Sequence, residues 1–173
     1  MSLQTLGEGR FLRLVRDGRW EYVQRTNSSG AVFIVAVTAA RELVLVEQQR
    51  IPVGARTIEL PAGMIGDEAA FKDETISASA IRELEEETGY RGARAQILLS
   101  GPVAPGLTSE HLHLVQVFDL IRVSAGGGVD DEDITVHVIP LANVRPWLRA
   151  QAQTGKQIEP RIYAALDFVE QAG

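Results

Sequence analysis

The segment Arg82-Glu83-Leu84-Glu85-Glu86-Glu87-Thr88-Gly89-Tyr90 carries four glutamates in five positions. Apolar residues recur every three or four positions from Ile76 to Leu84, a spacing that predicts a helix from about Glu74 to Thr88. Gly89 then supplies the residue type that most often ends a helix. The glutamates therefore fall in the last turns of a predicted helix, where carboxylates are locally unfavourable.

Glu83, Glu86 and Glu87 share one side of this helix because they are spaced i, i+3 and i+4. Like charges at this spacing destabilise a helix by roughly 0.2–0.5 kcal/mol per pair. A divalent cation would turn the repulsion into ligation, and carboxylate oxygens without a nearby cysteine suit Mg²⁺ or Mn²⁺. A solvated acidic helix face is the alternative interpretation of the same three residues.

Residues upstream extend the pattern. Gly63 ends Glu59-Leu60-Pro61-Ala62-Gly63, and Glu74 stands eight positions before Arg82. With the glutamate segment, these residues resemble the signature of the Nudix hydrolase family: a Gly, a Glu, then Arg-Glu-apolar-x-Glu-Glu-x-Gly-apolar. Ten residues separate Gly63 from Glu74, more than is usual in the family, so we expect an insertion within Met64–Asp73, ahead of the helix.

The resemblance implies an α/β fold with a mixed β-sheet between helices, and hydrolysis of a nucleoside diphosphate linked to another group. It also implies metal ligands: Glu83 and Glu87 first, Glu86 as a shared ligand, and the carbonyl of Ala62, which we expect in a turn that follows a short strand. For Arg82 we expect a structural role, in which it pairs with an acid such as Glu86.

A base that activates water is also needed, and two loops offer candidates. One is Glu110, at the end of a Pro- and Gly-containing stretch from residue 101. The other is Asp130-Asp131-Glu132-Asp133, which is similar to the base-bearing acidic loop of bacterial ADP-ribose pyrophosphatases. An ungapped match selects Asp130, with Glu132 as its rival. Simple solubility is the alternative explanation of this acidic loop.

Two features are similar to Nudix members that cleave ADP-ribose. Pro105 lies fifteen positions after Tyr90, where those members carry a marker proline. Trp20-Glu21-Tyr22-Val23-Gln24-Arg25 is similar to their N-terminal strand, which reaches the partner's site in a homodimer. The resemblance assigns Trp20 to base stacking, Glu21 to a base amine and Arg25 to phosphate. Alternatively, Trp20 is a hairpin core residue and Arg25 a surface charge.

Arg50 and Glu59 match substrate-lining positions of the same subfamily. Arg50 suits a phosphate because its planar guanidinium can bind two oxygens. We therefore expect a Mg²⁺-dependent hydrolase that splits ADP-ribose into AMP and ribose 5-phosphate. The alternatives are a hydrolase of GDP-mannose or another sugar nucleotide, and a sensor of the same fold that binds without cleaving. The histidines, His111, His113 and His137, show no metal-ligand spacing.

Length and composition agree with one globular enzyme domain, residues 1–173. The apolar fraction is 45%, and a net charge of −6 argues against a nucleic-acid-binding surface. The chain has no cysteine, no apolar run long enough to span a membrane, and no signal-peptide core within Met1–Arg10. We expect a cytoplasmic protein whose partners are a small-molecule nucleotide sugar and a second copy of itself.

The remaining elements follow from periodicity and turn residues. An N-terminal hairpin is expected at about 10–26, around Asp17-Gly18. We expect further strands at 31–39, 43–49, 57–60, 95–100, 112–123 and 134–139, and helices at 141–153 and 159–171. Residues 124–133, Gly-rich and then acidic, are expected to form a flexible loop.

Overall fold

The computed structural model describes residues 3–128 and 133–171. It contains thirteen strands and three α-helices in this part of the chain, in mixed α/β order. Asp130 and Glu132, two of the three candidate bases, lie outside the described residues. No helix in the described ranges is both long and apolar enough to cross a membrane.

The first sheet has the order β7-β4-β10-β9. Its strands are β4 (Ala31–Ala36), β7 (Ala62–Met64), β9 (Arg94–Pro102) and β10 (His111–Phe118). β4 pairs parallel with β10 and antiparallel with β7, so the sheet is mixed. All six residues of β4 are buried, because helices cover both of its faces. The short strand β7 forms an edge of this sheet, where a cleft opens.

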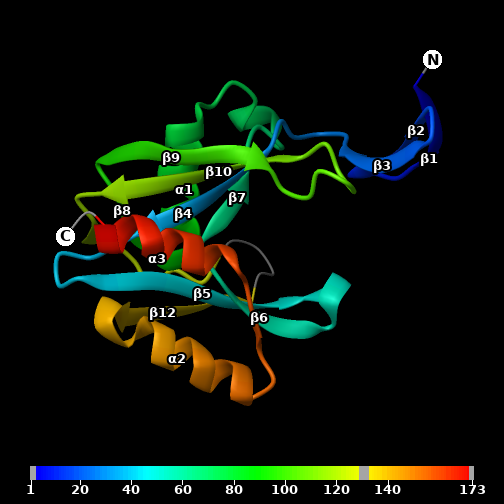
Figure 1. Ribbon diagram of the computed structural model, residues 1–173. Coiled ribbons are helices and arrows are strands. Elements are labelled where there is room, and N and C mark those ends of the chain that lie inside the picture. The colour runs from blue at the N-terminus through cyan, green and yellow to red at the C-terminus, as the bar shows by residue number, and fades with distance from the viewer. Residues whose placement is uncertain (1–2, 129–132, 172–173) are drawn as a thin grey trace.

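The second sheet has the order β12-β5-β6-β13. Its strands are β5 (Glu42–Arg50), β6 (Ala55–Glu59), β12 (Thr135–Pro140) and β13 (Gln157–Ile158). A single bridge between Val37 and Leu43 links the two sheets. The expected mixed α/β architecture is confirmed, and its two four-stranded sheets lie one above the other in Figure 1.

Three helices cover these sheets (Figure 1). α1 (Ile76–Thr88) packs on the first sheet and α2 (Leu141–Gln153) on the second, while α3 (Arg161–Gln171) covers the core shared by both. Alternate side chains of β4 point to opposite faces of the first sheet. Val32 and Ile34 pack on the face covered by α1, and Phe33 and Val35 pack on the face covered by α3. α1 begins at a Thr75 cap and ends at Gly89, whose φ of 73° is a left-handed conformation that glycine adopts readily.

The N-terminal residues form a separate three-stranded ribbon that projects from the body of the molecule (Figure 1). β2 (Leu12–Asp17) and β3 (Trp20–Arg25) are the expected hairpin, and β1 (Gln4–Glu8) is an added outer strand. The ribbon joins the body where the Val23 N–H donates to the Leu107 carbonyl at 2.9 Å. Six of its large apolar side chains are 36–55% exposed, namely Leu3, Leu6, Phe11, Leu12, Leu14 and Trp20, whereas Val15 of β2 is buried.

Two expectations about local structure were wrong. The predicted strand 112–123 breaks at Asp119, which has a φ of 58°, and its end forms β11 (Ile121–Arg122), paired with β8 (Tyr90–Arg91). The predicted turn at residues 61–63 is replaced by β7, which pairs antiparallel with β4. Residues 124–128 form a loop as expected, and the N–H groups of Gly127 and Gly128 donate to the carbonyls of Glu87 and Glu86 near the end of α1.

Glu47 anchors the second sheet through a buried ionic cluster. Its carboxylate accepts hydrogen bonds from Arg56 at 2.6 Å, Lys156 at 2.8 Å and His137 at 3.0 Å. Burial alone would raise the pKa of Glu47, but these hydrogen bonds outweigh it and lower the pKa to about 2. Arg56 also donates to Asp133 at 2.6 Å, so the last residue of the acidic segment is tied to the same cluster.

Candidate active site

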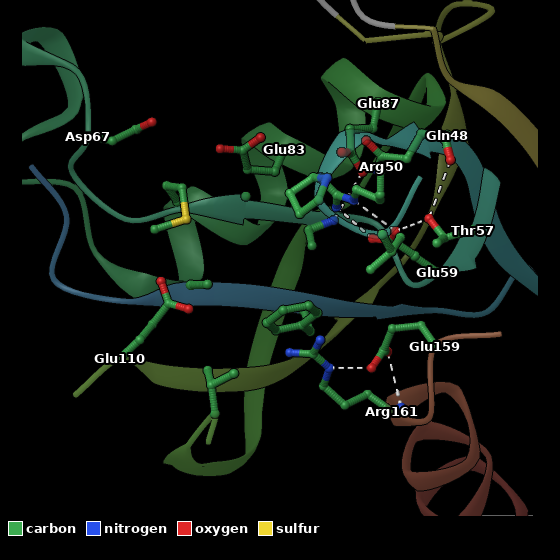
Figure 2. Close-up of a pocket in the computed structure, with 18 of the residues that line it drawn as sticks. Gln48, Arg50, Thr57, Glu59, Asp67, Glu83, Glu87, Glu110, Glu159 and Arg161 are labelled. Atoms are coloured by element: carbon green, nitrogen blue, oxygen red, sulfur yellow. Dashed lines mark hydrogen bonds and ion pairs between the residues drawn. The ribbon is translucent and has the colours of Figure 1, made fainter. Parts of the chain in front are cut away.

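A cleft of about 680 Å³ opens along the edge formed by β7, with α1 on one side and the start of α3 on the other. Figure 2 shows its lining side chains. The volume is within the range of small-molecule binding sites. Its charged lining residues are Arg25, Arg50, Glu59, Asp67, Glu68, Arg82, Glu83, Glu86, Glu87, Glu110, Glu159 and Arg161.

The α1 wall carries the predicted metal ligands. Glu87 is buried, and its carboxylate accepts a hydrogen bond from the Ala62 N–H at 3.0 Å. This bond connects α1 to the backbone of β7. Glu83 approaches the next residue of β7: a Cβ added to Gly63 would lie 1.8 Å from the Glu83 carboxyl carbon. Only glycine leaves room at position 63 for the carboxylate to lie against the strand.

The electrostatic environment of Glu83 disfavours its charged form. Burial raises the pKa of Glu83 most, Arg82 opposes the shift, and Glu86 and Asp67 add repulsion, so that the pKa rises to about 7. A carboxyl group in this position would be stabilised as the anion by an added cation, which is the behaviour expected of a metal ligand. Asp67 belongs to the expected insertion, so the insertion contributes charge to the site.

Arg82 holds the acidic side chains in place. Its guanidinium donates to Glu86 at 2.9 Å and to Glu74 at 3.1 Å, and lies 3.0 Å from Glu83. The expected pairing of Arg82 with Glu86 is therefore present. The Phe71 ring, also from the insertion, lies against the same guanidinium, with its centroid 4.2 Å from Cζ.

The cleft has a large excess of negative charge. Eight carboxylates and four arginines line it, so an anionic substrate would be repelled without added cations. The eight carboxylates offer only oxygen atoms as metal ligands, and oxygen ligands suit hard divalent ions. In the described residues no three carboxylate or imidazole groups are already gathered into a cation-binding cluster. One oxygen of Glu86 accepts a hydrogen bond from Arg82, and one oxygen of Glu87 accepts the Ala62 N–H.

Arg50 and Glu59 form the wall that faces α1. Arg50 donates to the two Glu59 oxygens at 2.8 and 2.6 Å, and Thr57 donates to the same carboxylate. Burial would raise the pKa of Glu59, but Arg50 and Thr57 outweigh burial and hold the pKa below its usual value. Both predicted residues thus lie in the cleft as one bidentate ion pair (Figure 2).

Arg25 and Glu110 form a third group at the base of the N-terminal ribbon. They are ion-paired with each other although 85 positions separate them in the sequence. Both line the cleft of their own chain. The structure therefore brings together Glu110, a candidate base, and Arg25, a predicted phosphate ligand. The Glu110 carboxylate is already ion-paired with the Arg25 guanidinium.

Other predicted residues lie elsewhere. Trp20 is 55% exposed, Glu21 pairs with Arg16, and neither lines this cleft. Pro105 is exposed outside it, although Val103 of the same loop is part of the lining. The sequence reading missed four charged lining residues: Asp67, Glu68, Glu159 and Arg161.

Comparisons with known proteins agree with the fold and with the family that the sequence resembles. A family model described as the NUDIX domain matches residues 28–161, and the chain belongs to the Nudix family. Members of this family generally use divalent metal ions. A solved structure titled "Crystal structure of ADP compounds hydrolase" matches with a TM-score of 0.74 at 22% identity, covering 99% of this chain and 91% of that chain. This likeness supports the fold alone.

Curated proteins with higher sequence identity to this chain are named for several different activities. The ADP-sugar pyrophosphatase of Mus musculus is 40% identical over 106 residues, which are 57% of this chain and 46% of the relative. The ADP-ribose pyrophosphatase of Bacillus subtilis (strain 168) is 31% identical over 104 residues, 60% of this chain and 54% of the relative. The methanol dehydrogenase activator of Bacillus methanolicus is 36% identical over 104 residues, again 60% and 54%. The chain spans about half the length of the curated relatives it matches.

Proposed function

We propose that this protein hydrolyses the pyrophosphate bond of ADP-ribose, or of a similar nucleoside diphosphate sugar, with Mg²⁺ as its metal and Mn²⁺ as a substitute. The observation that carries the proposal is the pairing of Glu83 and Glu87 with β7 in a cleft that also holds Arg25 and Arg50. An acidic wall suited to cations faces arginines suited to phosphate. Two relatives named for ADP-ribose or ADP-sugar cleavage support the substrate class.

In this proposal the α1 wall provides the metal ligands. Glu83, Glu86 and Glu87, with the Ala62 carbonyl, hold divalent metal, which supplies Lewis-acid activation of the diphosphate and of water. Arg82 keeps the three side chains positioned and compensates part of their charge. Arg50, fixed by Glu59, orients the substrate so that water attacks one phosphorus in line with its leaving oxygen.

The base that accepts the proton of water has two candidate locations. Glu110 is ion-paired with Arg25, so its carboxylate already has a partner in the cleft. Asp130 and Glu132 remain candidates, because the preceding glycines are bonded to the carbonyls of Glu86 and Glu87 at the end of α1. We favour the acidic segment over Glu110 on this ground.

The test of the proposed function is a substrate panel. We expect the purified chain with Mg²⁺ to convert ADP-ribose into AMP and ribose 5-phosphate, separated by ion-exchange chromatography, and expect EDTA to abolish the reaction. GDP-mannose and other sugar nucleotides are measured in parallel. A higher kcat/KM for GDP-mannose would replace ADP-ribose as the substrate. Binding of ADP-ribose without any product, with either metal, would instead identify a sensor.

We further propose a homodimer in which the N-terminal ribbon of each chain reaches its partner's cleft. Trp20 and Glu21 lie outside the cleft of their own chain, and the ribbon projects with exposed apolar side chains. An apolar surface of this kind is typical of an interface between subunits. In the dimer, Trp20 would stack on the base of a substrate bound to the partner.

Subunit mixing tests this arrangement. Trp20→Ala is expected to raise KM more than it lowers kcat, because stacking is remote from the reacting phosphorus. When Trp20→Ala and Glu87→Gln chains are denatured, mixed and refolded, each mixed dimer regains one intact site. The mixture should then recover about a quarter of the wild-type activity at low substrate concentration, since about half of the dimers are mixed. Recovery no greater than the sum of the separate variants would rule the arrangement out.

A further inference from the structure

Arg161 begins α3 at the opposite end of the cleft from the Asp67 loop (Figure 2). Its Nε donates to one Glu159 oxygen at 2.6 Å, and its backbone N–H donates to the other at 3.1 Å. The guanidinium lies flat enough over Phe33 for Cζ to be 3.7 Å from the ring centroid. Glu159 therefore holds one edge of the Arg161 guanidinium, and Phe33 holds one of its faces.

The terminal nitrogens of Arg161 differ from those of Arg82 and Arg50, whereas Arg25, like Arg161, donates to its carboxylate partner through Nε. Arg82 donates to Glu74 and Glu86, and Arg50 is held by both oxygens of Glu59. Within the described chain, the hydrogen bonds of the Arg161 side chain involve Nε, and neither Nη1 nor Nη2 has a protein acceptor. This side chain keeps 30% of its surface exposed. Two parallel N–H donors thus remain for a ligand.

Arg161 lies close to β7, the strand that the proposed metal ligands contact. Phe33, on which Arg161 stacks, is the β4 residue paired with Ala62 of β7. Arg161 thus approaches the β7 edge from the α3 side, while Glu83 and Glu87 approach it from the α1 side. A ligand that crosses this edge would meet carboxylates at one end and a guanidinium at the other.

We propose that Arg161 binds the phosphate of the substrate's diphosphate group that lies farther from the α1 carboxylates. The proposal rests on the proposed function and adds a recognition residue to the same site. Its paired N–H donors match two oxygens of one phosphate. Glu159 and Phe33 are positioning residues, because they hold the guanidinium and leave its terminal nitrogens directed to the cleft. The competing explanation is that Arg161 only ties α3 to the first sheet.

Arg161→Met tests the proposal, with Arg145→Met as its matched control. Arg145 also pairs with a carboxylate, Glu170 at 3.0 Å, and lies over an aromatic ring, Tyr163, but it does not line the cleft. We expect Arg161→Met to raise KM about 10- to 100-fold, the size of a lost hydrogen bond to a charged group, and to change kcat by less than about threefold. Arg145→Met should change neither.

Binding without turnover gives a second readout. The dissociation constant of a methylene-linked ADP-ribose analogue should rise by a similar factor in Arg161→Met. AMP, which has one phosphate, should lose less affinity than the analogue. If Arg161→Met does not fold, Arg161→Lys keeps the charge but loses the paired donors, and should raise KM about 10-fold.

The outcomes separate the two proposals. An unchanged KM and analogue affinity in a folded Arg161 variant, with the wild type active, would overturn the role of Arg161 alone. Equal losses of thermal stability in the Arg161 and Arg145 variants with no kinetic difference would support the structural tie and also overturn it. A wild type that neither binds nor cleaves any nucleotide sugar would refute the proposed function, and the inference with it.

Discussion

Glu87→Gln is expected to lower kcat by about 10³-fold, equivalent to about 4 kcal/mol of transition-state stabilisation. Glu87 is buried beside β7, and an amide of the same shape can still accept the Ala62 N–H. The fold should therefore survive while one anionic ligand is lost. Without metal, the variant should be at least as stable as the wild type, because it removes one of several mutually repelling charges in the last turn of α1.

Glu85→Gln is the matched control for this variant. Glu85 lies on the same helix but outside the cleft, where it pairs with Arg91 at 2.6 Å. The measurements are kcat with saturating Mg²⁺, the affinity for Mn²⁺ by electron paramagnetic resonance, and thermal unfolding without metal. Glu87→Gln should weaken Mn²⁺ binding at least about 10-fold, and Glu85→Gln should not change it. Turnover within about threefold of wild type would exclude Glu87 as a ligand.

The second large effect is expected from a single methyl group. Gly63→Ala would place Cβ 1.8 Å from the Glu83 carboxyl carbon and 2.1 Å from one of its oxygens. The atoms in the way are the end of a flexible side chain, so Glu83 can swing aside and the protein can still fold. A displaced ligand carboxylate is a misplacement of about 1 Å or more, which costs on the order of 10²-fold in rate. We expect activity to fall far more than stability.

Gly101→Ala serves as the control, since a Cβ at that position of β9 meets nothing within 4 Å. Both variants are compared by kcat and by urea unfolding. For Gly63→Ala, a loss of about 100-fold in kcat should accompany a change in unfolding free energy of no more than about 1 kcal/mol. A large loss of stability with normal kcat in the remaining folded fraction would contradict the steric argument.

The sequence was most informative where structure is local. The helix predicted from about Glu74 to Thr88 is α1, Ile76–Thr88, and its stop at Gly89 is confirmed. The hairpin around Asp17-Gly18 and the helix at 141–153 are confirmed as well. These elements depend on periodicity and on turn or capping residues a few positions apart, all of which are visible in the chain itself.

Contacts between distant segments could not be predicted in this way. Arg25 and Glu110 gave no sign of pairing, because only the junction of the N-terminal ribbon with the 101–110 loop brings them together. The role of Arg161 was not predicted, because the sequence placed it inside a helix starting at Glu159. The helix α3 instead begins at Arg161, so Glu159 lies before the helix and accepts a hydrogen bond from the arginine. Charge alone does not distinguish such a residue from a solvated one.

The ten residues between Gly63 and Glu74 have a consequence for how the rim of this cleft can vary among Nudix proteins. The loop is fixed at both ends: Gly63 packs against Glu83, and Phe71 stacks on Arg82 just before the Thr75 cap starts α1. Doubling the length of a flexible loop costs only about 0.6 kcal/mol in closure entropy. Evolution can therefore vary this segment, and with it the rim of the cleft at Asp67 and Glu68, while α1 keeps the same starting point.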